Sequence, residues 1–209
     1  MLEIVTFTLG PVMTNSYLIA DPQTGESAVV DPADEGETIV KEAGNRGWRI
    51  GNIWLTHAHF DHLAGAAGVA DHVDPPPPVA LHPEDYVLWR MQGGAPLFGM
   101  HIDPGPEPTV ELQHGQALHL GSNLFEVRHA PGHTRGHVVF YCEQQKVVFC
   151  GDVIFKLSIG RTDLPGGDYA TLISSINTQI LSLPDDTRLL SGHGPETSVG
   201  YERRMNPFI

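Results

Sequence analysis

The chain has 209 residues, of which 41% are hydrophobic and 18% charged, a composition typical of an ordinary globular protein. The formal net charge is −13 at pH 7 and the 12 Lys and Arg residues are scattered, which argues against a nucleic-acid partner. The sequence has no run of about 18 apolar residues and no N-terminal signal pattern. We therefore expect a single domain over residues 1–209 that is cytoplasmic and has no membrane partner.

Apolar runs separated by turn residues predict a meander of strands at the N-terminus, followed by helices. Ile39, Val40 and Ala43 recur at helical spacing before a closing glycine, which indicates a helix. The proline run 75–78 cannot lie inside a helix and forms a stiff connector. The predicted elements are strands at 2–9, 16–20, 27–30 and 49–55 and helices at 34–47 and 63–72.

The second part of the chain repeats this mixture of strands and helices. Sheets near both ends with helices between them indicate a layered α/β architecture. Cys142 and Cys150 flank a predicted hairpin, and we expect them to be core residues rather than a disulfide. The predicted elements are strands at 79–82, 117–120, 123–129, 137–142, 146–150 and 187–191, helices at 83–91 and 168–182, and a long Gly- and Pro-rich loop at 92–116.

The sequence THAHFDH, residues 56–62, directly follows a predicted buried strand. Side chains two apart in an extended segment point the same way, so His57, His59 and Asp61 can converge while His62 points elsewhere. One ion could hardly use all four, so the pattern indicates two adjacent metal ions in a hydrolytic site. The alternative is a polar turn in which the histidines occur by chance.

Three further candidate ligands follow predicted strands, each next to a glycine. They are His133 in PGHTRGH, Asp152 in CGD and His193 in SGHG. Each alone would be an ordinary turn residue, but with the first motif they complete a set of five histidines and two aspartates. A carboxylate such as Asp152 can bridge two cations. His137 is predicted to support the site or the core rather than to bind metal, and residues 15–17 could support the site from beneath.

The order HxHxDH, His, Asp, His resembles that of the metallo-β-lactamase superfamily over nearly the whole chain. The resemblance implies a four-layered αββα sandwich with the site at one edge of the two sheets. It also implies two divalent metal ions, with zinc expected first and iron or manganese as alternatives. In that family's arrangement His57, His59 and His133 hold one ion, Asp61, His62 and His193 hold the other, and Asp152 bridges them.

Within the superfamily, the chain most resembles glyoxalase II (hydroxyacylglutathione hydrolase) and its small single-domain relatives. The segments that carry this resemblance are THAHFDHLAG, APGHTRGHVVFY, FCGDVIFKLSIGRTDLPGG and GHGPETSVGYERRMNPF. It implies a small-molecule thioester substrate such as S-lactoylglutathione, attacked by metal-bound hydroxide that Asp61 orients. Glyoxalase II has a helical extension that helps to bind glutathione, whereas this chain has 16 residues after His193. Glutathione recognition therefore stays an open question.

Arg161, nine residues after Asp152, matches a basic residue that binds the glutathione end of the substrate in glyoxalase II. It could bind a substrate carboxylate, or it could pair with Asp163 or Asp168.

Two other functions of the chain stay open. One is that of the persulfide dioxygenases, which share a GRTD segment and hold a single iron; the other is a metal-stabilised binding module without turnover. RNA-processing relatives use similar metals, but the negative charge disfavours that function.

Overall fold

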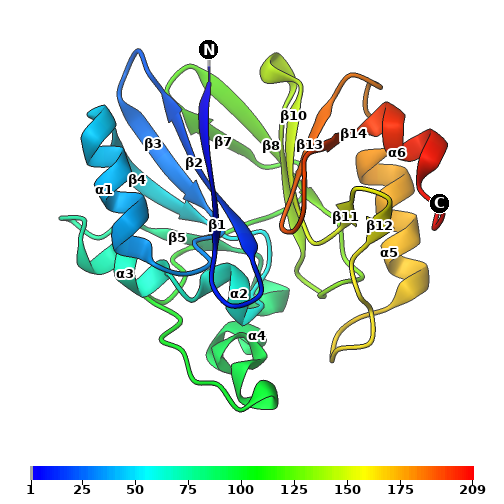
Figure 1. Cartoon of the computed structure of the whole chain (residues 1–209), viewed down its shortest axis with the longest axis horizontal. Coiled ribbons are helices and arrows are strands. Elements are labelled where there is room, and N and C mark those ends of the chain that lie inside the picture. Colours follow the sequence, from blue (N-terminus) through cyan, green and yellow to red (C-terminus); the bar gives the residue numbers. More distant parts are fainter. Residues whose placement is uncertain (1) are drawn as a thin grey trace.

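The computed structural model describes residues 2–209, which form two six-stranded sheets packed face to face with helices outside (Figure 1). This is the αββα sandwich that the family resemblance implied, and it agrees with the layered α/β architecture predicted from the pattern of elements. The first sheet has the order β1 (Glu3–Leu9), β2 (Thr14–Asp21), β3 (Glu26–Val30), β4 (Arg49–Trp54), β5 (Val79–Leu81) and β6 (Val110–Glu111). The second has the order β14 (Thr197–Ser198), β13 (Arg188–Ser191), β10 (Val147–Gly151), β9 (Val138–Cys142), β8 (Asn123–His129) and β7 (Ala117–Leu120).

Helices cover the outer face of each sheet. Helices α1 (Gly36–Arg46) and α3 (Ala66–Asp71) lie on the first, and α5 (Tyr169–Ser175) and α6 (Val199–Met205) lie beside the second (Figure 1). The short helices α2 (Phe60–Leu63) and α4 (Tyr86–Arg90) lie at the lower edge in this view. No helix within residues 2–209 combines the length and apolar character needed to cross a bilayer.

Apolar side chains fill the space between the layers, and this burial is the main stabilising contribution. Trp54 of the first sheet meets Phe125 of the second edge to face, with ring centroids 5.1 Å apart. A second cluster joins the first sheet to α1 and α3, and a third joins the second sheet to α5. Cys142 and Cys150 are buried free thiols in β9 and β10, which confirms that they are core residues.

The carboxylate of Asp21 joins the two sheets at the end of β2. It is buried and accepts hydrogen bonds from the amide and hydroxyl of Ser122, both at 2.7 Å, and from the amide of Gln23 at 2.9 Å. These donors lower the pKa of Asp21 to about 2 because they stabilise the charged form.

The helix predicted at 63–72 is shorter in the structure: only Ala66–Asp71 form α3, and Leu63 is the last residue of the preceding helix α2. The amide of Gly65 donates to the carbonyl of Pro32 at 2.8 Å. A Cβ at this glycine would lie 2.8 Å from the carbonyl oxygen of Asp34. Close packing against the loop after β3 therefore interrupts the helix that the local pattern favours.

Several short elements escaped prediction because they depend on tertiary partners. The predicted loop 92–116 contains the 3₁₀ region Gln92–Phe98, which has a kink at Gly93 and Gly94, and strand β6, which pairs with β5. The region expected to form one helix at 83–91 begins as the 3₁₀ turn Pro83–Asp85 before α4. Helix α5 continues as the π-helical turn Ile176–Ile180. The two-residue strands β11 (Ile154–Phe155), β12 (Ser158–Ile159) and β14 and the helix α6 were not predicted.

Candidate metal centre

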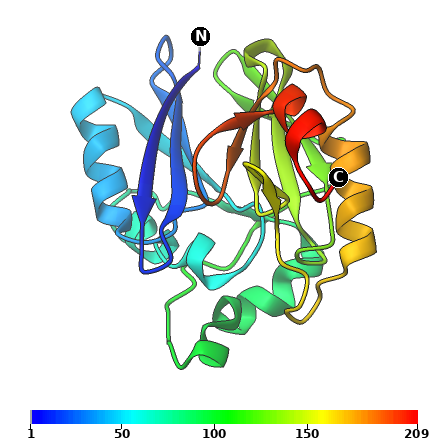
Figure 2. The ribbon, with the colours of Figure 1, turned by 45° about the vertical axis from the view of Figure 1, so that its right-hand side comes forward.

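All seven predicted ligands lie in loops or short helices that follow strands β4, β8, β10 and β13; Figure 2 shows the two sheets that bear these strands side by side. The first sheet contributes the segment after β4, and the second contributes three loops that follow β8, β10 and β13. Side chains from four separate parts of the chain therefore converge. They are His57, His59, Asp61 and His62 from the first sheet and His133, Asp152 and His193 from the second.

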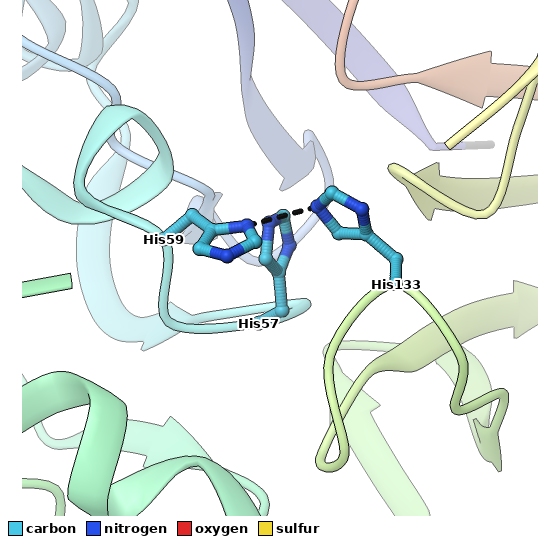
Figure 3. Close-up of side chains that lie close together, drawn as sticks. All are labelled: His57, His59 and His133. Atoms are coloured by element: carbon cyan, nitrogen blue, oxygen red, sulfur yellow. Dashed lines mark hydrogen bonds between the residues drawn. The ribbon is translucent and has the colours of Figure 1, made fainter. Parts of the chain in front are cut away.

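His57, His59 and His133 lie close together and form the first candidate ligand set (Figure 3). Their candidate ligand atoms lie within 4.8 Å of one another, and His59 Nδ1 is 2.9 Å from His133 Nε2. Hydrogen bonds at the opposite ring nitrogens orient two of the rings. His57 Nδ1 lies 3.0 Å from Thr56 Oγ1, and His133 Nδ1 lies 2.7 Å from the carbonyl oxygen of Arg161. Their Nε2 atoms are thereby left for a metal ion.

Asp61, His62 and His193 form the second set. Asp61 Oδ2 lies 3.5 Å from His62 Nε2 and 3.3 Å from His193 Nε2. The extended-chain prediction that His62 points away from His57 and Asp61 was wrong. Residues 60–63 are helical, so the side-chain direction no longer alternates, and the His62 ring centroid lies 4.2 Å from that of His57.

The carboxylate of Asp152 lies between the two sets. Its Oδ2 is 3.6 Å from the Nε2 atoms of both His133 and His193, and its Oδ1 is 3.3 Å from His62 Nε2. Gly192 permits this close packing, because a Cβ there would contact Asp152 Oδ1 and lie 2.5 Å from His62 Cε1. One carboxylate therefore contacts both ligand sets.

Burial and neighbouring charges give the histidines different pKa shifts. Burial lowers the pKa of His57 and lowers that of His59 to about 3. Burial also disfavours the charged forms of His62 and His193, but the nearby carboxylates outweigh it and raise the pKa of both. The pKa of Asp61 falls to about 2 although burial opposes this, because His62 and His193 lie beside it. Metal binding at the second set would therefore release protons.

The donor set fits divalent cations. His57 Nε2, His62 Nε2 and Asp152 Oδ1 are buried and have no hydrogen-bond partner among the described residues. A buried polar atom without a partner costs about 1–3 kcal/mol, and coordination to a cation would remove that cost at all three atoms. Imidazole and carboxylate donors suit zinc, iron and manganese.

Asp31 is a supporting residue that the sequence reasoning missed. Its Oδ2 accepts from Thr56 Oγ1 at 2.6 Å and lies 2.9 Å from His62 Nδ1, and its Oδ1 accepts from the Thr56 amide at 2.7 Å. Asp31, His57 and His62 lie close enough together to form a third candidate ligand set. However, both carboxylate oxygens of Asp31 already accept hydrogen bonds from Thr56. The sequence did contain one signal for Asp31: it directly follows the strand β3, just as the candidate ligands follow their strands.

The first hairpin supports the site, as was predicted for residues 15–17. Asn15 Nδ2 donates to the carbonyl oxygens of Ser191 and Gly194 at 3.0 and 2.9 Å, which holds the His193 loop. Tyr17 donates its hydroxyl to the same Ser191 carbonyl at 2.7 Å. Next to them, Thr14 Oγ1 donates to Asp61 Oδ2 at 2.9 Å.

Two buried residues connect the ligand-bearing segments to one another. His137 stacks on His57 at 4.7 Å, and its Nε2 accepts from the Asp152 amide at 3.0 Å, which fits a supporting rather than a ligand role. Asp85, also missed from sequence, accepts from the Ala58 amide at 3.0 Å, Thr134 Oγ1 at 2.8 Å and the Gly136 amide at 2.7 Å. It therefore ties the His57–His59 segment to the His133 loop.

Arg161 lies at the surface and pairs with Asp163. Its Nε and an Nη atom donate to the two carboxylate oxygens of Asp163, each at 2.8 Å. Such exposed pairs contribute little stability, so a substrate carboxylate could compete for the guanidinium. The pairing alternative is therefore present in the structure, and the substrate-binding role stays a prediction.

Comparisons with known proteins agree with this geometry. The chain is 36% identical to the hydroxyacylglutathione hydrolase GloC of Haemophilus influenzae, over 100% of this chain and 97% of that protein. The crystal structure of TTHA1623 in a di-iron-bound form is 40% identical, with a TM-score of 0.89 over 98% of this chain and 100% of that one. The crystal structure of the BLEG-1 B3 metallo-beta-lactamase is 36% identical, with a TM-score of 0.91 over 100% and 99% of the two chains. The sequence profile of the metallo-beta-lactamase superfamily matches residues 9–193, and the chain belongs to that superfamily.

Proposed function

We propose that the chain is a metallo-hydrolase that cleaves thioesters at a dinuclear centre. The observation that carries this proposal is the position of Asp152, whose carboxylate contacts one histidine of the first set and two of the second. The similarity to the hydroxyacylglutathione hydrolase GloC supports a thioester as the substrate class.

In this proposal His57, His59 and His133 hold one ion, Asp61, His62 and His193 hold the other, and Asp152 binds both. When bound, such ions supply a water of lowered pKa and polarise the substrate carbonyl. Asp61 and His193 keep side-chain exposures of 15% and 30%, whereas His57 and His62 are fully buried. Asp61 therefore lies where the site opens to solvent, and we assign it the role of orienting the attacking water.

The leaving group needs little assistance from the protein. A thiol has a pKa of about 8.5, so it departs as a thiolate near neutral pH without a strong general acid. Arg161 lies at the surface beside the His133 loop, to which its carbonyl is hydrogen-bonded, and would bind a carboxylate on the substrate. The exposure of Asp61 and His193 also disfavours a purely structural site, because such sites are normally closed.

Two other enzymatic functions share this scaffold. The structural similarity to the BLEG-1 B3 metallo-beta-lactamase is the observation that supports β-lactam hydrolysis as an alternative. Persulfide dioxygenation is favoured by the GRTD segment at residues 160–163. Both reactions are separable from thioester cleavage by their products.

The test is a parallel assay on one metal-loaded preparation. Thiol release from S-lactoylglutathione, opening of a chromogenic cephalosporin and oxygen uptake with glutathione persulfide are measured together. The proposal expects thiol release to have the highest kcat/KM. Faster cephalosporin opening, or oxygen uptake without thiol release, would assign the chain to one of the other two functions.

A further inference from the structure

Exposed apolar side chains are concentrated next to the metal centre. Four of the eleven exposed large hydrophobic residues within 2–209 lie in the short stretch from residue 87 to residue 98. They are Val87, Met91, Leu97 and Phe98, with exposures of 50–67%. A cluster of exposed apolar side chains usually marks a binding surface, whereas single exposed apolar residues are normal on a protein surface.

This stretch is packed firmly against the ligand-bearing segment. Gly93 has a φ of +60°, and a Cβ there would lie 2.5 Å from Phe60 Cα and 2.8 Å from the carbonyl oxygen of Ala58. The ring of Phe98 packs against that of Phe60 with centroids 5.6 Å apart. Figures 1 and 2 show α4 and the segment after it, in green, below the loop edge of the sheets. These contacts therefore hold the backbone of the stretch next to the segment that bears His59.

Together with the loop around residue 165, these side chains form a pocket that begins at His59. Its volume is about 260 Å³. This is just below the range of about 300–1,000 Å³ for pockets that hold a whole drug-sized ligand, so it suits one arm of a substrate. The apolar lining consists of Val87, Leu88, Met91, Leu97, Phe98, Leu164 and Pro165.

The charges around the pocket do not favour an anionic arm. Glu84 and Arg135 both line it and are both exposed, so they offer one negative and one positive side chain. Asp85 also lines it, but three hydrogen bonds occupy its carboxylate. Glutathione carries two carboxylates, and the chain as a whole has a formal net charge of −13. The pocket therefore matches an uncharged, apolar group better than a glutathione moiety.

We infer that this pocket binds an aliphatic or aromatic arm of the substrate and so determines which thioesters are cleaved. The inference rests on the proposed thioester hydrolysis and adds a substrate class to it. The arm belongs to either the acyl or the thiol side of the thioester, because His59, the candidate metal ligand that lines the pocket, is near both sides of a bound ester. Each buried methylene should raise kcat/KM about fourfold until the pocket is full.

The test uses two series of thioesters. In the first, the acyl group on N-acetylcysteamine is lengthened from acetyl to octanoyl; in the second, the acyl group stays acetyl and the thiol is lengthened. A rise in kcat/KM over several methylenes in one series identifies the arm. S-Lactoylglutathione serves as the anionic comparison, and the inference expects it to be a poorer substrate than the best apolar ester.

Substitutions at the pocket wall provide the second readout. Leu97→Ser and Val87→Ser should reduce kcat/KM for the longest ester at least fivefold and leave that for the acetyl ester within twofold. Both side chains are more than 60% exposed, so folding should be unaffected. Leu124→Ser is the matched control, because Leu124 is an exposed leucine of β8 that does not line this pocket.

Binding of non-hydrolysable thioethers to the metal-free protein, measured by calorimetry, separates the two proposals. A chain-length dependence in binding, with no thioester cleaved by the metal-loaded enzyme, would support the pocket and refute the proposed function. Cleavage with flat chain-length profiles in both series, or equal losses in all three variants, would refute the pocket assignment.

Discussion

Asp85 offers a direct test of how the two histidine-bearing segments are held together. Its Oδ1 accepts from the Gly136 amide, and its Oδ2 accepts from the Ala58 amide and the Thr134 hydroxyl. Asp85→Ala removes the acceptor of three donors in the interior. Each unsatisfied buried donor costs about 1–3 kcal/mol, so three of them should lower the free energy of unfolding by at least about 3 kcal/mol.

Asp85→Asn is the gentler change, because the amide oxygen can still serve the Ala58 and Thr134 donors. Its NH₂ group would then face the Gly136 amide, so one hydrogen bond is lost. Burial raises the pKa of Asp85, which means that a neutral side chain also relieves part of the cost of burying a charge. The expected loss is therefore smaller, about 1–2 kcal/mol.

Urea unfolding of chelator-treated protein, followed by circular dichroism, measures both losses by linear extrapolation. Asp71→Asn is the control, because Asp71 is exposed at the end of α3. If the Asn and Ala variants of Asp85 both stay within about 0.5 kcal/mol of the wild type, the range typical of surface substitutions, the carboxylate does not hold the two segments together.

Three further predictions concern Gly192, Asp21 and Arg161. Gly192→Ala should lower the metal content and reduce turnover at least tenfold, because the new Cβ would contact Asp152. Gly44→Ala is the control and should leave both unchanged, because a Cβ there meets no atom within 4 Å. Equal metal content in the two variants would contradict this prediction. The pKa of Asp21 is about 2 in the folded chain and about 3.9 when unfolded, so its contribution to stability is complete above about pH 4 and is lost as the pH falls toward 2. The difference in urea midpoint between wild type and Asp21→Asn should shrink over that range, and a constant difference would argue against it. Arg161→Ala should raise KM for S-lactoylglutathione about fivefold and leave KM for an uncharged thioester unaltered, and an unchanged KM for both would remove its binding role.

The convergence of the candidate ligands could be predicted from sequence because each group of them follows a strand with buried apolar residues. His57, His133, Asp152 and His193 lie just beyond β4, β8, β10 and β13, and strand ends at one edge of a sandwich converge. Local pattern and fold therefore agree at these positions.

The supporting residues could not be found in this way, because their partners are distant along the chain. Asp85 contacts residues 27 and 51 positions away, and Asp31 contacts His62, 31 positions away. Tertiary contacts likewise formed β6 and, at Gly65, shortened the helix predicted at 63–72 to α3. The direction of His62 was mistaken because the extended chain becomes helical at Phe60. The apolar pocket was missed because the expected loop 92–116 contains a 3₁₀ segment, Gln92–Phe98, that forms its wall.

The central claim is that two metal ions share the carboxylate of Asp152. Elemental analysis of protein purified without added metal, and again after loading with zinc, iron or manganese and desalting, measures it most directly. We predict about two ions per chain in the wild type and a clear loss in Asp152→Ala, with circular dichroism confirming that the variant is folded. One ion per chain in the wild type after loading, or two retained by folded Asp152→Ala, would contradict it.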